Sequence, residues 1–143
     1  MRVAENHQGV IRFIGYRMVD LQYHCDENYE LPSDKQVPYS FSIGKKVEML
    51  SATEMQVNLR ATVLQAEEEI EESAPYMIAV EIVGRFIADT PIDPKWETNA
   101  LAILFPYIRS IVSSVTAQSG REPIILPTVN LVQMFSDAED KDN

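Results

Sequence analysis

Apolar and polar side chains alternate through much of the N-terminal half of the chain. The alternation is most regular at 54–65 and 74–89, with apolar side chains at Val57, Leu59, Ala61 and Val63 and then at Tyr76, Ile78, Val80 and Ile82. Because successive side chains of a strand point to opposite faces of a sheet, this pattern predicts two half-buried β-strands. Residues 38–43 alternate in the same way, and we expect that strand to continue past a kink to Leu50.

The stretch from Val10 to Tyr23 is rich in β-branched and aromatic residues, but both of its alternating phases mix polar with apolar side chains. Gly15 lies inside it, and a glycine within a strand pattern often marks a bulge, which switches the side-chain phase. The stretch therefore predicts a first strand, or two short collinear strands. Gly84 interrupts the strand at 74–89 in the same manner and predicts a bend there.

The apolar spacing changes to a helical period after residue 103. Ile108, Ile111, Val112 and Val115 follow the i, i+3, i+4, i+7 pattern of a buried helical stripe. Pro106 suits the first turn of this helix, since a proline there gives up an N–H that would have had no partner, and Gly120 predicts its end. A second face carries small side chains that allow another helix to come close: Ser110, Ser113, Ser114 and Ala117.

The segments on either side of this helix are interrupted by prolines. Residues 90–102 predict an ordered connection with a helical turn, and Pro123 and Pro127 favour an extended segment between them. A short second helix is expected over 129–137. Four strands before two helices indicate an α+β domain, with the helices packed on one face of an antiparallel sheet. We expect one domain over 1–143, with the sheet in 10–89, the crossover and helices in 90–137, and an acidic tail in 138–143.

The formal net charge of −10 argues against nucleic acid or an anionic membrane as the main partner. The glutamate-rich segment 66–73 reads as a solvated loop. The N-terminus has no apolar core of the signal-peptide kind, and no apolar run approaches the ~20 residues that cross a bilayer. Cys25 has no second cysteine to pair with, which fits a reducing compartment. These features predict a soluble, cytoplasmic protein.

The sequence contains no recognisable catalytic or metal-binding motif. His24 and Cys25 are adjacent, so in an extended segment they point to opposite sides and are poorly placed as base and nucleophile. Asp89, Asp93 and Glu97 lie in a proline-interrupted segment, where solvation explains them better than a metal does. We therefore expect a binding domain that is not an enzyme and uses no cofactor.

Several motifs resemble the family of SecB, the bacterial protein-export chaperone. Leu104-Phe105-Pro106-Tyr107 matches the family's signature for the start of its long helix. Segment 127–131, PTVNL, resembles the start of its last helix, with Leu131 in place of an aromatic residue. Asp20-Leu21, the strand at 57–63 and Gly84-x-Phe86 fall in matching order, so the resemblance covers roughly residues 10–136.

The resemblance implies a twisted four-stranded sheet with two helices, assembled as a dimer of dimers. It implies a protein that holds unfolded polypeptides in apolar grooves without ATP or metal. The groove positions it implies are Tyr39, Tyr76, Met77, Ile78, Tyr107, Leu126 and Phe135. The alternative for these positions is packing in the core, which we favour for Ile78 and Phe135. The small-residue face of the long helix, with Ser110, Ser113, Ser114 and Ala117, suits the contact between chains.

The chain also departs from the family's pattern. In the export chaperones, acidic residues on the outer sheet face meet the motor SecA; Asp20 matches one of them, while His24 and Ala79 stand where glutamates are expected. SecA therefore stays open as a partner. The alternative to a general holdase is an interaction or scaffold protein with one dedicated partner, such as an antitoxin.

Overall fold

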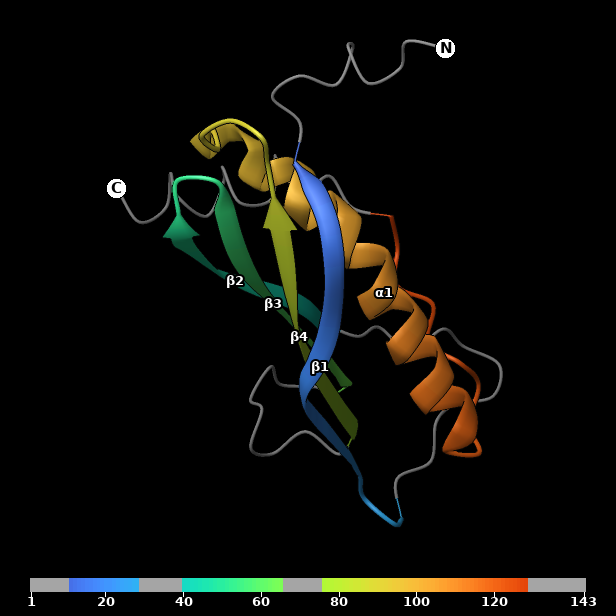
Figure 1. Ribbon diagram of the computed structural model, residues 1–143. Helices are drawn as coiled ribbons and strands as arrows, with labels where there is room; N and C mark the ends of the chain where they lie inside the picture. The colour runs from blue at the N-terminus through green and yellow to red at the C-terminus, as the bar shows by residue number, and fades with distance from the viewer. Residues whose placement is uncertain (1–10, 29–39, 66–75, 129–143) are drawn as a thin grey trace, which may run out of the picture.

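The computed structural model describes residues 11–28, 40–65 and 76–128, which form one antiparallel sheet with a long helix on one of its faces (Figure 1). In chain order the elements are β1 (Arg12–Cys25), β2 (Ser40–Ser51), β3 (Glu54–Gln65), β4 (Tyr76–Ile87), a 3-10 turn η3 (Pro94–Trp96) and α1 (Glu97–Gln118). The predicted α+β class and the four antiparallel strands are confirmed. The second helix expected at 129–137 lies outside the described residues.

The sheet has the order β1-β4-β3-β2, so the first and last strands are neighbours. The strands β2 and β3 form a hairpin around Ala52 and Thr53, and β3 pairs with β4 along its whole length without a shift in register. β1 and β2 are left as the two edges of the sheet. The strong alternation in β3 and β4 follows from this order, because these central strands have one face against the core.

β1 contains two bulges, where the register against β4 shifts between Phe13 and Gly15 and again between Met18 and Asp20. The bulge at Gly15 was predicted, and Gly15 has a φ of 155°; the second bulge was not. Each bulge adds one residue and so moves the following side chains to the other face. As a result, five apolar residues of β1 in two different phases all pair with the core-facing row of β4: Phe13, Tyr16, Met18, Leu21 and Tyr23 lie opposite Phe86, Gly84, Ile82, Val80 and Ile78.

The other two glycines in the strands do not mark bulges. The β2–β3 register runs through Gly44 and the β3–β4 register runs through Gly84 without a shift. Gly84 instead allows a close approach by α1. A Cβ at this position would lie 2.6 Å from Cδ2 of Leu104, a distance that side chains in contact do not tolerate.

The long helix begins earlier than predicted, at Glu97, so Pro106 lies inside it rather than in its first turn. Asp93 caps the preceding turn η3, where its side chain accepts a hydrogen bond of 3.0 Å from the backbone N–H of Lys95, and α1 continues directly from that turn. Pro106 has no N–H to donate to the carbonyl of Ala102, four residues earlier. Both residues are exposed, so water can satisfy that carbonyl. The predicted end is confirmed, since Gly120 has a φ of +88° just after Gln118.

α1 lies across the face formed by β4 and β3. Its buried residues recur at helical spacing and include Leu101, Leu104, Phe105, Ile108 and Val112. An ion pair from Lys45 on β2 to Glu97 ties the first turn of the helix to the sheet edge, and the rings of Phe41 and Phe105 lie 6.1 Å apart. The segment Pro94–Gln118 is long and apolar enough to span a membrane by length and composition alone, and it packs on the sheet as core helices do.

Candidate functional site

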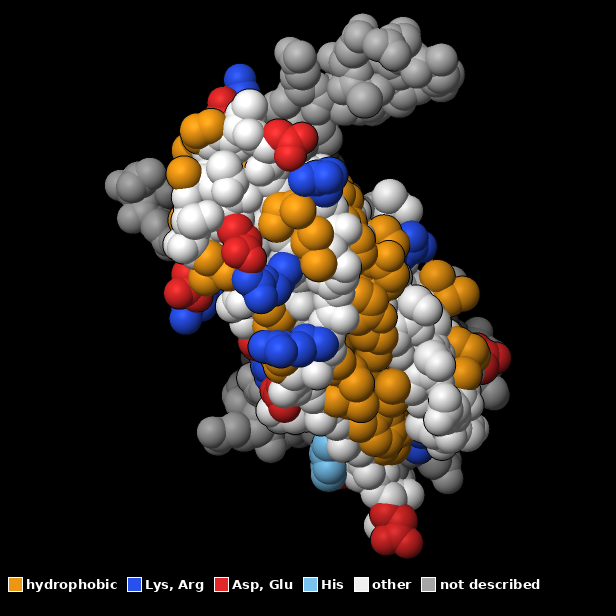
Figure 2. All heavy atoms as spheres, viewed as in Figure 1, with side chains coloured by type: hydrophobic (Ala, Val, Ile, Leu, Met, Phe, Trp, Pro, Cys, Tyr) orange, Lys and Arg blue, Asp and Glu red, His pale blue; other side chains and the backbone are white. Residues whose placement is uncertain are grey.

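Exposed apolar side chains gather along the line where β1 meets α1. Figure 2 shows them as a continuous hydrophobic band running the length of the sheet edge. We give the name β1–α1 stripe to five exposed apolar residues on this side of the sheet: Tyr16 (39% exposed), Met18 (47%), Leu21 (40%) and Tyr23 (38%) from β1, and Tyr107 (37%) from α1. None of them carries a charge, and large contiguous apolar patches of this kind usually mark interaction surfaces.

Aromatic contacts hold the stripe in place. The rings of Tyr16 and Tyr107 are 4.4 Å apart between centroids, and Phe13 lies beneath them, 5.8 Å from Tyr107 and 5.4 Å from Phe86 of the core. At the other end, Tyr23 meets the ring of Tyr76 edge to face at 5.6 Å. Such tilted and edge-on pairs are favourable geometries for aromatic rings, so the stripe is preformed.

The predicted groove residues do not form one exposed surface. Tyr107 belongs to the stripe, but Tyr76 (1% exposed), Ile78 (0%) and Leu126 (0%) are buried. Met77 points to the opposite side of the sheet from Tyr76 and Ile78, because it is the neighbour of both along β4. Tyr39 and Phe135 lie outside the described residues.

Tyr76 is buried in an unusual way. Its hydroxyl group is inaccessible to solvent and has no hydrogen-bond partner among the residues that the structure describes. Burial raises the pKa of Tyr76 to about 12, because the ionised form would lose its hydration. The guanidinium carbon of Arg121 lies 5.8 Å from the centre of its ring. Tyr76 therefore sits in the core beneath the start of the segment that follows α1.

That segment, residues 121–128, runs back along α1 from its C-terminal end (Figure 1), and we call it the strap. Side chains from one face of the helix hold its backbone. Arg109 Nε donates to the carbonyl of Leu126 at 3.0 Å, and Ser113 Oγ donates to the carbonyl of Ile124 at 2.9 Å. The N–H of Ile124 donates to Oγ1 of Thr116 at 2.8 Å. Ile124 and Leu126 are buried, whereas Ile125 between them is 70% exposed.

The residues expected at a contact between chains are mostly on the surface. Ser110, Ser114 and Ala117 are exposed, while Ser113 is half-buried and bonded to the strap. The two charged residues of α1 are Glu97, paired with Lys45, and Arg109, bonded to the strap. The exposed side of the helix is therefore uncharged.

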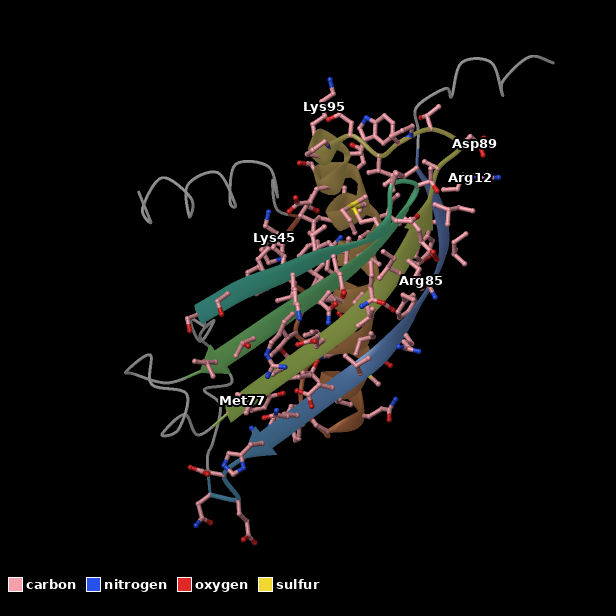
Figure 3. The ribbon with its side chains drawn as sticks, turned by 60° about the vertical axis from the view of Figure 1, so that its left-hand side comes forward. Arg12, Lys45, Met77, Arg85, Asp89 and Lys95 are labelled. Carbon is pink, nitrogen blue, oxygen red and sulfur yellow. The ribbon has the colours of Figure 1, made fainter. Side chains whose placement is uncertain are left out.

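The outer face of the sheet, turned away from α1, is polar and carries Met77 and Arg85 (Figure 3). Asp20, the residue expected to meet a partner, accepts a hydrogen bond of 2.8 Å from Arg60 Nη1. Oε1 of Glu81 lies 3.6 Å from the same nitrogen, and Arg85 pairs with Glu54. The Arg60 bond lowers the pKa of Asp20 below its usual value. Acidic groups on this face are thus matched by bases.

The acidity of the chain has another origin. Most of its excess negative charge lies in segments 66–73 and 137–142, outside the described residues. Among the residues that the structure describes, no group of three or more His, Cys, Asp or Glu side chains could hold a metal ion. The side chain of Cys25 is half-buried and unpaired by any disulfide.

The sequence model of the family described as "Preprotein translocase subunit SecB" matches residues 19–142. The chain belongs to the SecB family. Membership of this family supports a chaperone-type role. The SecB family relatives include a protein-export protein SecB of Methylococcus capsulatus, 25% identical over 79% of this chain and 78% of that protein. Another, from Paramagnetospirillum magneticum, is 26% identical over 82% of this chain and 81% of that protein.

An uncharacterized protein of Methanocaldococcus jannaschii is 37% identical over a shorter stretch, which spans 47% of this chain and 46% of that protein. Among solved structures, a SecB-like chaperone of Mycobacterium tuberculosis in complex with a peptide from an antitoxin has a TM-score of 0.66 at 15% identity. The match covers 83% of this chain and 90% of that one. This likeness establishes the shared SecB-like fold.

Four stripe residues, Tyr16, Met18, Leu21 and Tyr23, were not among the predicted site residues. Their signal in the sequence was the presence of apolar side chains in both phases of the first strand. A pattern with two phase changes looks irregular until the positions of both bulges are known.

Proposed function

We propose that the chain is an ATP-independent holdase, which binds unfolded or unstable polypeptides and keeps them from aggregating in the cytoplasm. The observation that carries this proposal is the uncharged apolar β1–α1 stripe on a SecB family member. Tyrosine and methionine side chains offer adaptable apolar area, which suits partners of varied sequence.

Self-association accompanies this function. The exposed side of α1 has no charge and carries the small side chains of Ser110, Ser114 and Ala117, which let a second helix approach closely. A dimer or tetramer built on this side of the helix would leave the polar outer sheet face in water. The molar mass by light scattering, alone and with an unfolded client, tests this directly.

A dedicated partner is the second candidate. The observation that favours it is the similarity in fold to a SecB-like chaperone solved with an antitoxin peptide. A pulldown that returns one stoichiometric protein, rather than many, would favour this reading over a general holdase.

SecA is the less favoured partner. Asp20 already pairs with Arg60, and Ala79 is buried between its neighbours in the sheet, so the outer face offers little unmatched acidity to a basic partner. Purified SecA should therefore not be retained by the immobilised chain at physiological salt.

The test of the holdase proposal uses a matched pair of methionines. Met18 in the stripe is 47% exposed and Met49, on β2 away from it, is 48% exposed. Met18→Ser should weaken the suppression of aggregation of thermally unfolding citrate synthase, because it places a hydroxyl in the apolar surface, whereas Met49→Ser should not. Wild-type protein that leaves aggregation unchanged would refute the proposal. If the Met18→Ser variant changes the mass of the oligomer but still suppresses aggregation of the client, the client site lies outside the stripe.

A further inference from the structure

The strap is an extended apolar segment already seated on the folded domain. Within it, Ile124 and Leu126 are directed into the core while Ile125 is 70% exposed, so side chains at every second position are buried. Pro123 and Pro127 flank these residues and favour the extended backbone. An unfolded client segment with apolar side chains at alternate positions has the same shape and chemistry.

Three side chains of α1 hold the strap through its backbone. Arg109, Ser113 and Thr116 are spaced by four and three residues along α1, so they lie on one helix face and meet the strap backbone together. All three bonds reach backbone atoms, which any polypeptide in extended form could supply. The hydroxyl of Thr116 also donates to the carbonyl of Val112 at 2.8 Å, which fixes its orientation toward the strap.

The seated strap also leaves one polar group unsatisfied. Tyr76 lies under Arg121 at the start of the strap, and its buried hydroxyl has no partner. A buried hydroxyl without a hydrogen bond is a penalty on the closed arrangement, and it would be relieved by water or by a client carbonyl once the strap lifts.

We propose that the strap is a built-in occupant of a polypeptide site on α1, and that an extended client segment with apolar residues at positions i and i+2 binds there by displacing it. This inference rests on the proposed polypeptide binding and adds a second client site, on α1, to the β1–α1 stripe. The proposal also explains why Leu126, a predicted groove residue, is buried: it belongs to the strap, which occupies the site in the absence of a client. The apparent affinity of the chain for a client then rises with the fraction of molecules in which the strap is released.

The direct test is hydrogen exchange at the amide of Ile124, which is bonded to Thr116 and exchanges only when the strap opens. The wild-type chain is measured with and without saturating reduced, carboxymethylated α-lactalbumin, a permanently unfolded probe. Displacement predicts that the probe accelerates exchange at Ile124 by about tenfold or more, while amides in the centre of β3 keep their protection. A probe that binds with Ile124 still protected would overturn the strap proposal and leave the holdase proposal standing.

A second measurement uses the strap side of the contact, which leaves Arg109, Ser113 and Thr116 in place. Leu126→Ala and Ile125→Ala form a matched pair, since the first weakens the seated strap and the second changes its exposed side chain. We expect Leu126→Ala to bind the probe about tenfold more tightly than wild type, since it raises the released fraction, and Ile125→Ala to bind as wild type does. If Leu126→Ala binds the probe and wild type does not, this result would also support the proposal that the seated strap blocks the client site. If neither wild type nor Leu126→Ala binds the probe, both proposals fail.

Discussion

The contact between Gly84 and Leu104 makes the sharpest prediction about this fold. Gly84→Ala would place a Cβ 2.6 Å from Cδ2, 3.1 Å from Cδ1 and 3.2 Å from Cγ of Leu104. Leu104 is fully buried between the sheet and the helix, so its side chain has no free space to turn into. The variant must therefore shift the side chain off its rotamer or lift α1 from β4.

Overpacking of this kind costs about 1–3 kcal/mol of folding free energy. The loss of glycine's freedom in the unfolded chain offsets about 0.4–1 kcal/mol of it. The middle values of these two ranges leave a net loss of about 1.3 kcal/mol, which should lower Tm by about 4 °C for a domain of this size. Thermal and urea unfolding followed by circular dichroism would measure both quantities.

Gly44→Ala is the matched control, because nothing lies within 4 Å of a Cβ at that strand position. We expect its stability to equal or slightly exceed that of wild type. The cause is then checked with Leu104→Ala, which alone should cost about 2–5 kcal/mol. If the new Cβ of Gly84→Ala clashes with Leu104, the variant with both substitutions should lose less folding free energy than the two single variants added together, by about 1 kcal/mol or more. Full additivity, or a Gly84→Ala protein as stable as wild type, would refute the reasoning.

Three further predictions concern polar groups. Thr116→Val removes the acceptor for the Ile124 N–H and should destabilise the fold by about 1–3 kcal/mol in urea unfolding; an unchanged midpoint would mean that this bond is not maintained in solution. Tyr76→Phe removes a buried hydroxyl without a partner, so stability should stay the same or rise by up to about 1 kcal/mol, and a clear loss would reveal a partner. Because the folded pKa of Tyr76 is about 12 against 10.0, wild-type stability should also fall as the pH rises between those values, and Tyr76→Phe should lack this fall. The pKa of Asp20 is lowered by Arg60, so its stabilising effect is present above the usual aspartate pKa and is lost as the pH falls through the folded value; Arg60→Gln should flatten this acid dependence in unfolding titrations.

The sequence by itself determined the strands and the class of fold. In β3 and β4 one face of each strand meets the core along its whole length, so every second residue is buried and the strands can be read directly from the sequence, although Ala79 and Val83 on the other face of β4 are buried as well. The end of α1 was equally local, because Gly120 alone supplies a left-handed conformation there. The start of α1 was misread, since Pro106 is compatible with a first turn, whereas the helix continues from the turn η3 that Asp93 caps and carries Pro106 at an exposed position inside it.

The surface was decided by tertiary structure. Tyr16 and Leu21 belong to opposite phases of the first strand, and only the pairing of that strand with β4 through two bulges brings them to one side. Tyr76 and Leu126 were predicted to line a groove, but both are buried in the core, where Tyr76 meets Tyr23 and Arg121, residues distant from it in the chain. The alternation of apolar and polar side chains reflects which residues of a strand are buried along its own length. Gly15 signalled one register shift of β1, but the second shift and the path of the returning strap depend on residues far away in the chain, so no local pattern records them.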